Sequence, residues 1–217
     1  MAFNYEIEGE LVCKVNGNGR FIAKKGCMVA YQGDFQFDKM LLGPDNGRGF
    51  LGGLVGQVTR KITKENIELM AISGNGVIYL AENAAHIVVI NLDNDEFCIE
   101  SENLLGFDEQ LKYELRFVGV GVVSQKGMVT SCLKGTGRVI IKSQGNPIIL
   151  ESPCVVDPDA IVGWTGDRDP RIKTDVSWKT LVGQSSGESY QLDFNWKGST
   201  VIVQPCERWH TNPHIVD

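Results

Sequence analysis

Apolar and polar residues alternate along most of this chain with the period of two that a half-buried β-strand produces. The clearest examples are residues 68–72, 77–80, 112–117 and 189–194. Helical spacing of apolar residues is rare, and its one candidate, residues 53–64, begins at a glycine pair that favours a short helix or a turn. We therefore expect an all-β fold.

A strand, a glycine-containing turn and a second strand recur three times, in residues 65–80, 127–141 and 187–203. The last glycines of these turns are Gly76, Gly137 and Gly198, each 61 residues from the next. Self-similarity at a fixed period is typical of repeat architectures. Because a lone hairpin buries too little surface to be stable, we expect the three hairpins to pack on one another.

Two further markers accompany each predicted hairpin. A short apolar strand ending in an aromatic ring precedes each hairpin, at Met28–Tyr31, Leu104–Phe107 and Ile161–Trp164. A connector containing glycine also recurs once per unit, at residues 54–57, 119–122 and 181–184. The aromatic residues Tyr31, Phe107 and Trp164 either fill the core between stacked units or line a pocket at an interface.

Together these markers predict one all-β domain over residues 1–217 with a threefold internal repeat. The approximate repeats are residues 28–83, 103–144 and 160–205. We expect residues 1–27 to complete the sheet of the last repeat or to cap the first. Residues 206–217 lie outside the pattern, and we expect them to form an irregular tail.

Charge restricts the partners that this chain can bind. Its formal net charge is −6 and its pI about 5.2, so its overall field repels phosphate backbones. We interpret the basic pairs Lys24-Lys25 and Arg60-Lys61 as solvated surface. The chain starts without a leader pattern, and no apolar run approaches the ~18 residues of a membrane span. We expect a cytoplasmic protein with no membrane span and no nucleic-acid partner.

The six cysteines are scattered, and no two of them form a Cys-x-x-Cys pair. That spacing argues against a zinc knuckle or a thioredoxin-type motif. Several lie in apolar stretches, where a reduced cysteine serves as a small core residue. We therefore expect all six to be reduced thiols: Cys13, Cys27, Cys98, Cys132, Cys154 and Cys206.

Two glycine-rich stretches, residues 43–49 and 52–56, resemble loops whose backbone amides bind phosphate. No Gly-Lys-Ser/Thr follows them, and they lack the strand–helix context of a nucleotide loop. We interpret both as connectors, and we expect Gly53 to lie near a contact between subunits.

The residues that could carry chemistry do not form a recognisable site. His86, His210 and His214 are too few and too scattered for a cupin-type metal centre, so we expect no metal. Ser185-Ser186-Gly187 fits a turn better than a nucleophile elbow. Four carboxylates flank Trp164 without the spacing of a calcium loop, and we interpret them as turn residues: Asp157, Asp159, Asp167 and Asp169. We therefore expect no catalytic residues and no cofactor.

Three segments, residues 21–33, 49–54 and 156–164, resemble the bacterial branch of the altered-inheritance-of-mitochondria protein twenty-four family. Segments 156–158 and 186–188 also match its pattern, so the resemblance extends over almost the whole chain. It implies a double-stranded β-helix of β-sandwich repeats similar to the tryptophan RNA-binding attenuation protein, three per chain. It further implies assembly into a symmetric ring, and it implies no known activity.

Three functional hypotheses follow. The first is a non-enzymatic oligomeric scaffold or small-ligand-binding protein, with three chains in the ring as the expected number. The alternative is a nucleic-acid-binding protein of the attenuation type, and the third is a cupin-like metalloenzyme. The acidic charge and the scattered histidines favour the first.

Overall fold

The computed structural model describes residues 3–40, 68–118, 128–174 and 190–208. The first strands are β1 (Asn4–Glu8), β2 (Val12–Lys24), β3 (Met28–Met40), β4 (Leu69–Leu80) and β5 (His86–Glu100). A 3-10 turn, η1 (Ser101–Asn103), leads to β6 (Leu104–Asp108), β7 (Lys112–Val118) and β8 (Met128–Ser143). The last strands are β9 (Ile148–Glu151), β10 (Cys154–Val156), β11 (Ile161–Thr165), β12 (Arg171–Thr174), β13 (Tyr190–Phe194) and β14 (Thr200–Val203).

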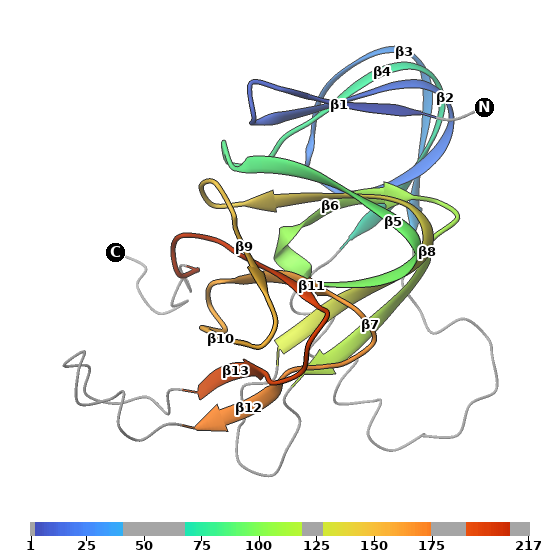
Figure 1. Ribbon diagram of the computed structural model, residues 1–217. Coiled ribbons are helices and arrows are strands. Elements are labelled where there is room, and N and C mark those ends of the chain that lie inside the picture. Colours follow the sequence, from blue (N-terminus) through green and yellow to red (C-terminus); the bar gives the residue numbers. More distant parts are fainter. Residues whose placement is uncertain (1–2, 41–67, 119–127, 175–189, 209–217) are drawn as a thin grey trace, which may run out of the picture.

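The all-β expectation is confirmed, and every strand pairing in the described residues is antiparallel. The large sheet follows the path β3-β4-β2-β6-β8-β5-β11-β14-β9, with β1 beside β2 and β7 beside β8. A small sheet has the order β10-β13-β12. In Figure 1 the N-terminal strands lie at the top and the small sheet at the bottom. No helix in the described part of the chain is long and apolar enough to span a membrane.

Glycines bend the longest strands instead of ending them. Gly74 and Gly76 lie inside β4, where they pair with Gly19 and Gly17 of β2, and Gly33 of β3 also faces Gly76. All five have a φ between +127° and +155°, which side chains disfavour. A Cβ on Gly76 would lie 2.1 Å from a carbonyl oxygen of β3. The aligned glycines therefore let β2, β3 and β4 arch together, as Figure 1 shows.

The prediction of a hairpin in each of the three repeats was consequently wrong. Gly135 and Gly137 also lie within one continuous strand, β8, opposite a bulge at Leu92–Asp95 in β5. Gly198 lies in a bend between β13 and β14, but these two strands belong to different sheets and do not pair with each other. A Gly-x-Gly sequence permits either a bend or a reversal, and pairing with neighbouring strands decides between them.

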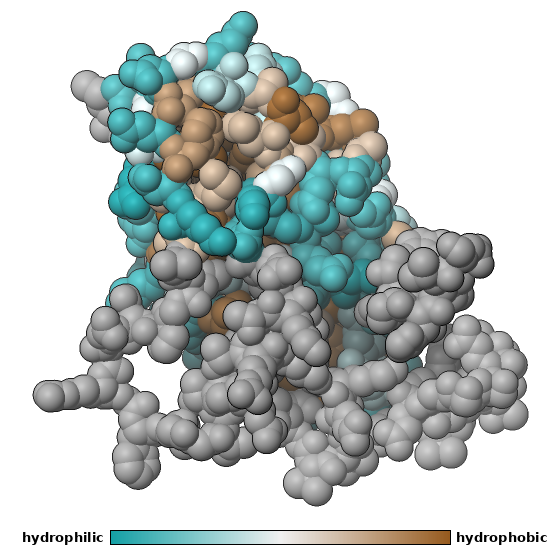
Figure 2. Space-filling model, turned by 180° about the vertical axis from the view of Figure 1, so that it is seen from behind, coloured by the Kyte–Doolittle hydropathy of each residue, from teal (hydrophilic) through white to brown (hydrophobic). Residues whose placement is uncertain are grey.

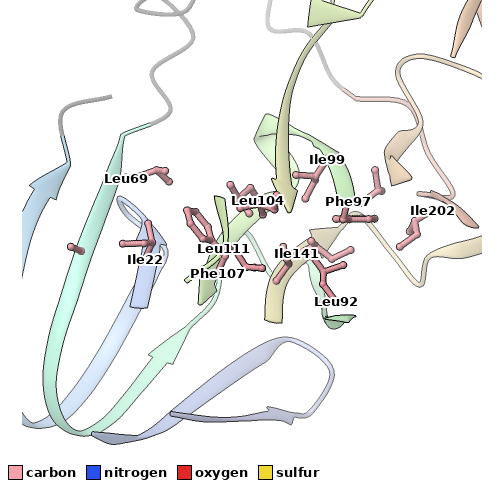
Figure 3. Close-up of a cluster of buried hydrophobic side chains, with 14 residues drawn as sticks. Ile22, Leu69, Leu92, Phe97, Ile99, Leu104, Phe107, Leu111, Ile141 and Ile202 are labelled. Carbon is pink, nitrogen blue, oxygen red and sulfur yellow. The ribbon is translucent and has the colours of Figure 1, made fainter. Parts of the chain in front are cut away.

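Three clusters of buried side chains form the core. The first runs across the large sheet from Leu69 and Ile22, through Phe107 and Ile141, to Ile202 (Figure 3). The second packs β1 and the N-terminal strands against β5, β6 and β8. The third surrounds Trp164 beside the small sheet. The core is therefore shared between strands that are far apart in the sequence.

Candidate functional site

Strands β6 and β11 each lie between two other strands of the large sheet. β6 pairs with β2 along one edge and β8 along the other, and β11 pairs with β5 and β14 in the same way. They contain the apolar segments Leu104–Phe107 and Ile161–Trp164, and all of these residues are buried. These two strands join parts of the chain that would otherwise have free edges.

The third apolar segment, Met28–Tyr31, begins β3 and carries the same backbone irregularity. A one-residue shift in register occurs at Leu104–Gly106 opposite β8, at Ile161–Gly163 opposite β14 and at Met28–Ala30 opposite β4. Each shift is a bulge that inserts one extra residue into the marker strand. β3, β6 and β11 therefore make equivalent contacts along one edge, and we call them the marker strands.

The other edge of β3 has no strand beside it among the described residues. Met28, Val29 and Tyr31 are 37%, 61% and 48% exposed, whereas Phe107 is 2% exposed and Trp164 is fully buried. Two of the three repeated aromatic residues thus fill the core, and the third lies on the surface. A bare strand edge with apolar side chains is a site at which another strand can pair.

The exposed end of β3 continues into an aromatic cluster. The ring of Tyr31 packs edge-on against Phe35 and Phe37, with ring centres 6.0 and 5.4 Å apart. Phe3 stacks beside Phe35 at 6.5 Å. Figure 2 shows hydrophobic residues gathered on the upper part of the face seen there, over the N-terminal strands. The bare edge and this cluster form one continuous apolar region.

A second bare edge lies near the other end of the chain, on β10. This strand pairs only with β13 in the described residues, and Val155 at its centre is 47% exposed. Val155 lies six residues before the marker strand β11, as Cys98 lies six before β6 and Ile22 six before β3. The sequence contains this spacing, but only the strand register shows that these residues occupy equivalent positions.

Ile22 and Cys98 both pair with a marker aromatic residue. Ile22 lies opposite Phe107 in the β2–β6 pair, and Cys98 lies opposite Trp164 in the β5–β11 pair. We call these two pairings the internal junctions. Val155 lies the same six residues before a marker strand as Ile22 and Cys98 do. In the described residues, however, no strand pairs with the outer edge of β10, the strand that contains Val155.

A side-chain acceptor lies beside each internal junction. At the first, Asp108 accepts a hydrogen bond of 2.6 Å from the Tyr5 hydroxyl and one of 2.9 Å from the backbone N–H of Arg138. Burial, and then the bond to Asp108, raise the pKa of Tyr5. At the second, Thr165 accepts from the backbone N–H of Thr200 at 2.9 Å. In each case the acceptor is the residue that follows the marker aromatic.

One cysteine expectation is corrected: Cys98 and Cys132 form a disulfide. They are 34 residues apart, so no local motif reveals them, but the β5–β8 register places them directly opposite each other. The other four are free thiols, of which Cys13 and Cys27 are buried: Cys13, Cys27, Cys154 and Cys206. Burial raises the pKa of Cys13 and Cys27 to about 12.

Charged groups surround this disulfide. The Arg116 guanidinium donates to a Glu96 carboxylate oxygen at 2.7 Å and lies 3.5 Å from the sulfur of Cys98. Lys134 reaches the other oxygen of Glu96 at 3.3 Å, and Asp169 lies 3.4 Å from Arg116. Glu96 is 6% exposed, so its charge is buried beside its partners. Ion pairs of this kind offset the cost of burying a carboxylate.

The other chemical candidates have ordinary structural roles where they are described. Asp157 accepts from the backbone N–H of Asp159 within a turn, and Asp169 pairs with Arg116. His86 lies 3.2 Å from Glu10 at the surface. His210, His214, the glycine-rich stretches with Gly53 and Ser185–Gly187 fall outside the described residues.

The predicted basic pair Lys24-Lys25 does not form a continuous basic stripe. Lys24 donates to both oxygens of Glu82 at 2.9 and 3.0 Å, and Lys142 binds the same carboxylate at 2.9 Å. Lys25 pairs with Glu68. Burial lowers the pKa of Lys142. Each cation has a carboxylate partner, which reduces its attraction for phosphate.

Comparison with known proteins places this geometry in context. A family model described as mitochondrial biogenesis AIM24 matches residues 5–206, a range that includes both bare edges. The crystal structure of protein SPYM3_0169 from Streptococcus pyogenes aligns with a TM-score of 0.65, covering 94% of this chain and 93% of that one. The two sequences are 18% identical, so the similarity shows a shared fold. No curated protein matches the chain.

Proposed function

This chain belongs to the mitochondrial biogenesis AIM24 family, as its sequence predicted, and we propose that it is a non-enzymatic scaffold whose copies join head to tail. The observation that carries the proposal is the pair of bare edges on β3 and β10. Their equivalents inside the chain pair with each other at both internal junctions.

The path of the large sheet supports a threefold repeat. It consists of three successive triples, β3-β4-β2, β6-β8-β5 and β11-β14-β9, each with a marker strand first. β10 directly follows β9 in the chain, at the place that Ile22 and Cys98 occupy near the ends of β2 and β5. The marker strands share a bulge at the same place. We propose that the triples are three copies of one unit, of the double-stranded β-helix or β-sandwich type found in attenuation proteins. Such units would stack by pairing each marker strand with the preceding unit, as β6 pairs with β2 and β11 with β5.

The internal junctions also give a register for the contact between chains. Because Ile22 faces Phe107 and Cys98 faces Trp164, Val155 of one chain would face Tyr31 of the next. The pairing would be antiparallel, as at both internal junctions. Both side chains are about half exposed in the single chain and would become buried in the contact.

The energetics favour such a contact. Full burial of an exposed apolar side chain of this size is worth about 1.5–3 kcal/mol, and Val155 and Tyr31, which are already about half buried, would each gain about half of that. Pairing would also satisfy backbone groups of both edges. A head-to-tail contact with a constant rotation gives a ring when the rotation closes and an open filament when it does not. We propose three chains per ring, which would place nine units around one axis.

Light scattering coupled to size-exclusion chromatography tests the proposal. We expect a mass about three times the 23.9 kDa of one chain. A mass of one chain over a wide range of concentration would contradict head-to-tail assembly. Native mass spectrometry of the same sample would count the subunits and reveal any small molecule retained between them.

A further inference from the structure

The disulfide Cys98–Cys132 has a buried carboxylate beside it. A side-chain oxygen of Glu96 and the two sulfur atoms all lie within 4.8 Å of one another. Three groups that can each donate an electron pair to a cation therefore converge on one point. In the described residues no other group of three cysteine, histidine or acidic side chains converges in this way.

We propose that Cys98, Cys132 and Glu96 form a redox-gated site for a thiophilic divalent cation such as Zn²⁺. The site is closed while the two sulfurs are bonded to each other, and it opens when a dithiol reduces them. This inference is independent of the proposed assembly, because all of its residues belong to a single chain and none lies on the β3 or β10 edge. It replaces the expectation, drawn from sequence spacing, that the cysteines offer no metal site.

The redox step is an ordinary thiol–disulfide exchange. A dithiol attacks one sulfur, forms a mixed disulfide and then closes on itself, so that it loses two electrons and two protons. Cys98 and Cys132 gain those two electrons and two protons and become thiols. A divalent cation then binds both sulfurs as thiolates and displaces the two protons into solvent.

The fold keeps the ligands together after reduction. Cys98 and Cys132 are directly opposed on β5 and β8, with Cα atoms 4.1 Å apart. Two thiolates on one tetrahedral zinc ion lie about 3.8 Å apart, as follows from zinc–sulfur bonds of ~2.3 Å. Small side-chain rotations are therefore enough to change the disulfide into a chelating pair. Glu96 supplies a third ligand, and the fourth position remains for water.

The local charge also favours a cation. Once both thiols are ionised, the cluster carries two thiolates and the carboxylates Glu96, Glu114 and Asp169. Only two cations, Arg116 and Lys134, contact these carboxylates in the described residues. The cluster would therefore hold an excess of three negative charges, which a divalent ion reduces to one. Arg116 and Lys134 would then bind the Glu96 carboxylate and fix its orientation, as groups that hydrogen-bond to the ligands do in metal sites.

The cation can enter from the Glu96 side. Cys98 is fully buried and Cys132 is 2% exposed, whereas the side chain of Lys134 beside Glu96 is 63% exposed. One oxygen of the Glu96 carboxylate lies 3.9 Å from the Cys98 sulfur and the other lies 3.3 Å from the Lys134 ammonium, so Glu96 connects the sulfurs to an exposed side chain. A ligand at the rim of a buried sulfur pair gives the ion a first contact before it loses its water.

Cobalt(II) binding tests the proposal, because thiolate ligands give Co²⁺ an intense near-ultraviolet absorption. The intact protein is compared before and after anaerobic treatment with a dithiol that is then removed by desalting. We expect the reduced protein to bind one Co²⁺ per chain with thiolate bands, and the oxidised protein to show none. A count of six thiols in denaturant, against four before treatment, verifies the reduction.

Substitutions distinguish Co²⁺ binding at this site from Co²⁺ binding by the other cysteines. Cys98→Ser and Cys132→Ser should each abolish the bands, and Glu96→Gln should weaken Co²⁺ affinity about tenfold or more. Cys206→Ser, which removes an exposed free thiol, should leave them unchanged. A reduced wild-type protein without thiolate bands, bands that survive Cys98→Ser, or a disulfide that dithiols do not reduce in the folded protein would each overturn the proposal.

Discussion

The marker strands at the internal junctions and the marker strand at the N-terminal end differ in surroundings, although their sequences and bulges correspond. In β6 and β11 the segment is buried between two strands, and in β3 it is exposed along one edge. The same local sequence pattern therefore produces a core strand when strands pair with both of its edges, and a surface strand when a strand pairs with only one edge. The difference indicates what β3 lacks, which is a strand equivalent to β2 or β5.

The residue at one position of the marker segment differs between β3 and the other two marker strands. The third position of the segment is Gly106 in β6 and Gly163 in β11, but Ala30 in β3. A Cβ on either glycine would lie 2.7 Å from a carbonyl oxygen of the neighbouring strand. Ala30 carries that Cβ, so a strand that pairs with β3 must lie a few tenths of an ångström farther away. The proposed contact between chains is therefore looser than the internal junctions.

Replacing Trp164 by alanine should give the largest effect on stability. The side chain is fully buried and its indole N–H donates to the Arg168 carbonyl at 2.9 Å. We expect Trp164→Ala to lower the free energy of unfolding by about 3–5 kcal/mol. Tyr31→Ala, at the corresponding place in β3, should cost the single chain under about 1 kcal/mol. Chemical denaturation at low protein concentration, where chains are separate, measures both.

Equal losses of stability from Trp164→Ala and Tyr31→Ala would contradict the comparison. If Tyr31→Ala destabilised the isolated chain as much as Trp164→Ala, then Tyr31 would be a core residue like its counterparts. Trp164→Phe, which keeps most of the buried ring, serves as the control for a general failure to fold.

A charge on the β10 edge should have the next largest effect, and it should act on assembly alone. Val155→Lys would place an ammonium group opposite Tyr31 of the next chain, where pairing would remove its water. We expect head-to-tail association to weaken at least about a hundredfold, which equals about 2.7 kcal/mol. Sedimentation equilibrium measures the change. Leu11→Lys, on an exposed residue near the β1–β2 turn, should leave the association constant unaltered.

The sequence was sufficient to predict the all-β class, the family and the three marker segments. It could not separate the exposed Tyr31 from the buried Phe107 and Trp164, because exposure depends on strands that are distant in sequence. The disulfide was missed for the same reason, since only the β5–β8 register opposes Cys98 and Cys132. Local pattern therefore predicts strands well, but pairing determines what each strand does.

Ala30→Gly should give the smallest effect, with the opposite sign. Removing the Cβ would let the neighbouring strand approach β3 as closely as β2 approaches Gly106. We expect association to tighten severalfold, although glycine costs some backbone entropy. Titration by sedimentation equilibrium checks the direction. An association that weakens would show that the contact does not follow the spacing of the internal junctions.

The central claim, that the β3 and β10 edges pair in the internal register, is tested most directly by cross-linking. Tyr31→Cys and Val155→Cys are combined with Cys154→Ser and Cys206→Ser, and a short bismaleimide is added to the folded protein. We expect covalent species of up to three chains on a denaturing gel. A matched protein with Leu11→Cys in place of Tyr31→Cys should remain single chains. Single chains only from the Tyr31→Cys and Val155→Cys protein would contradict the account.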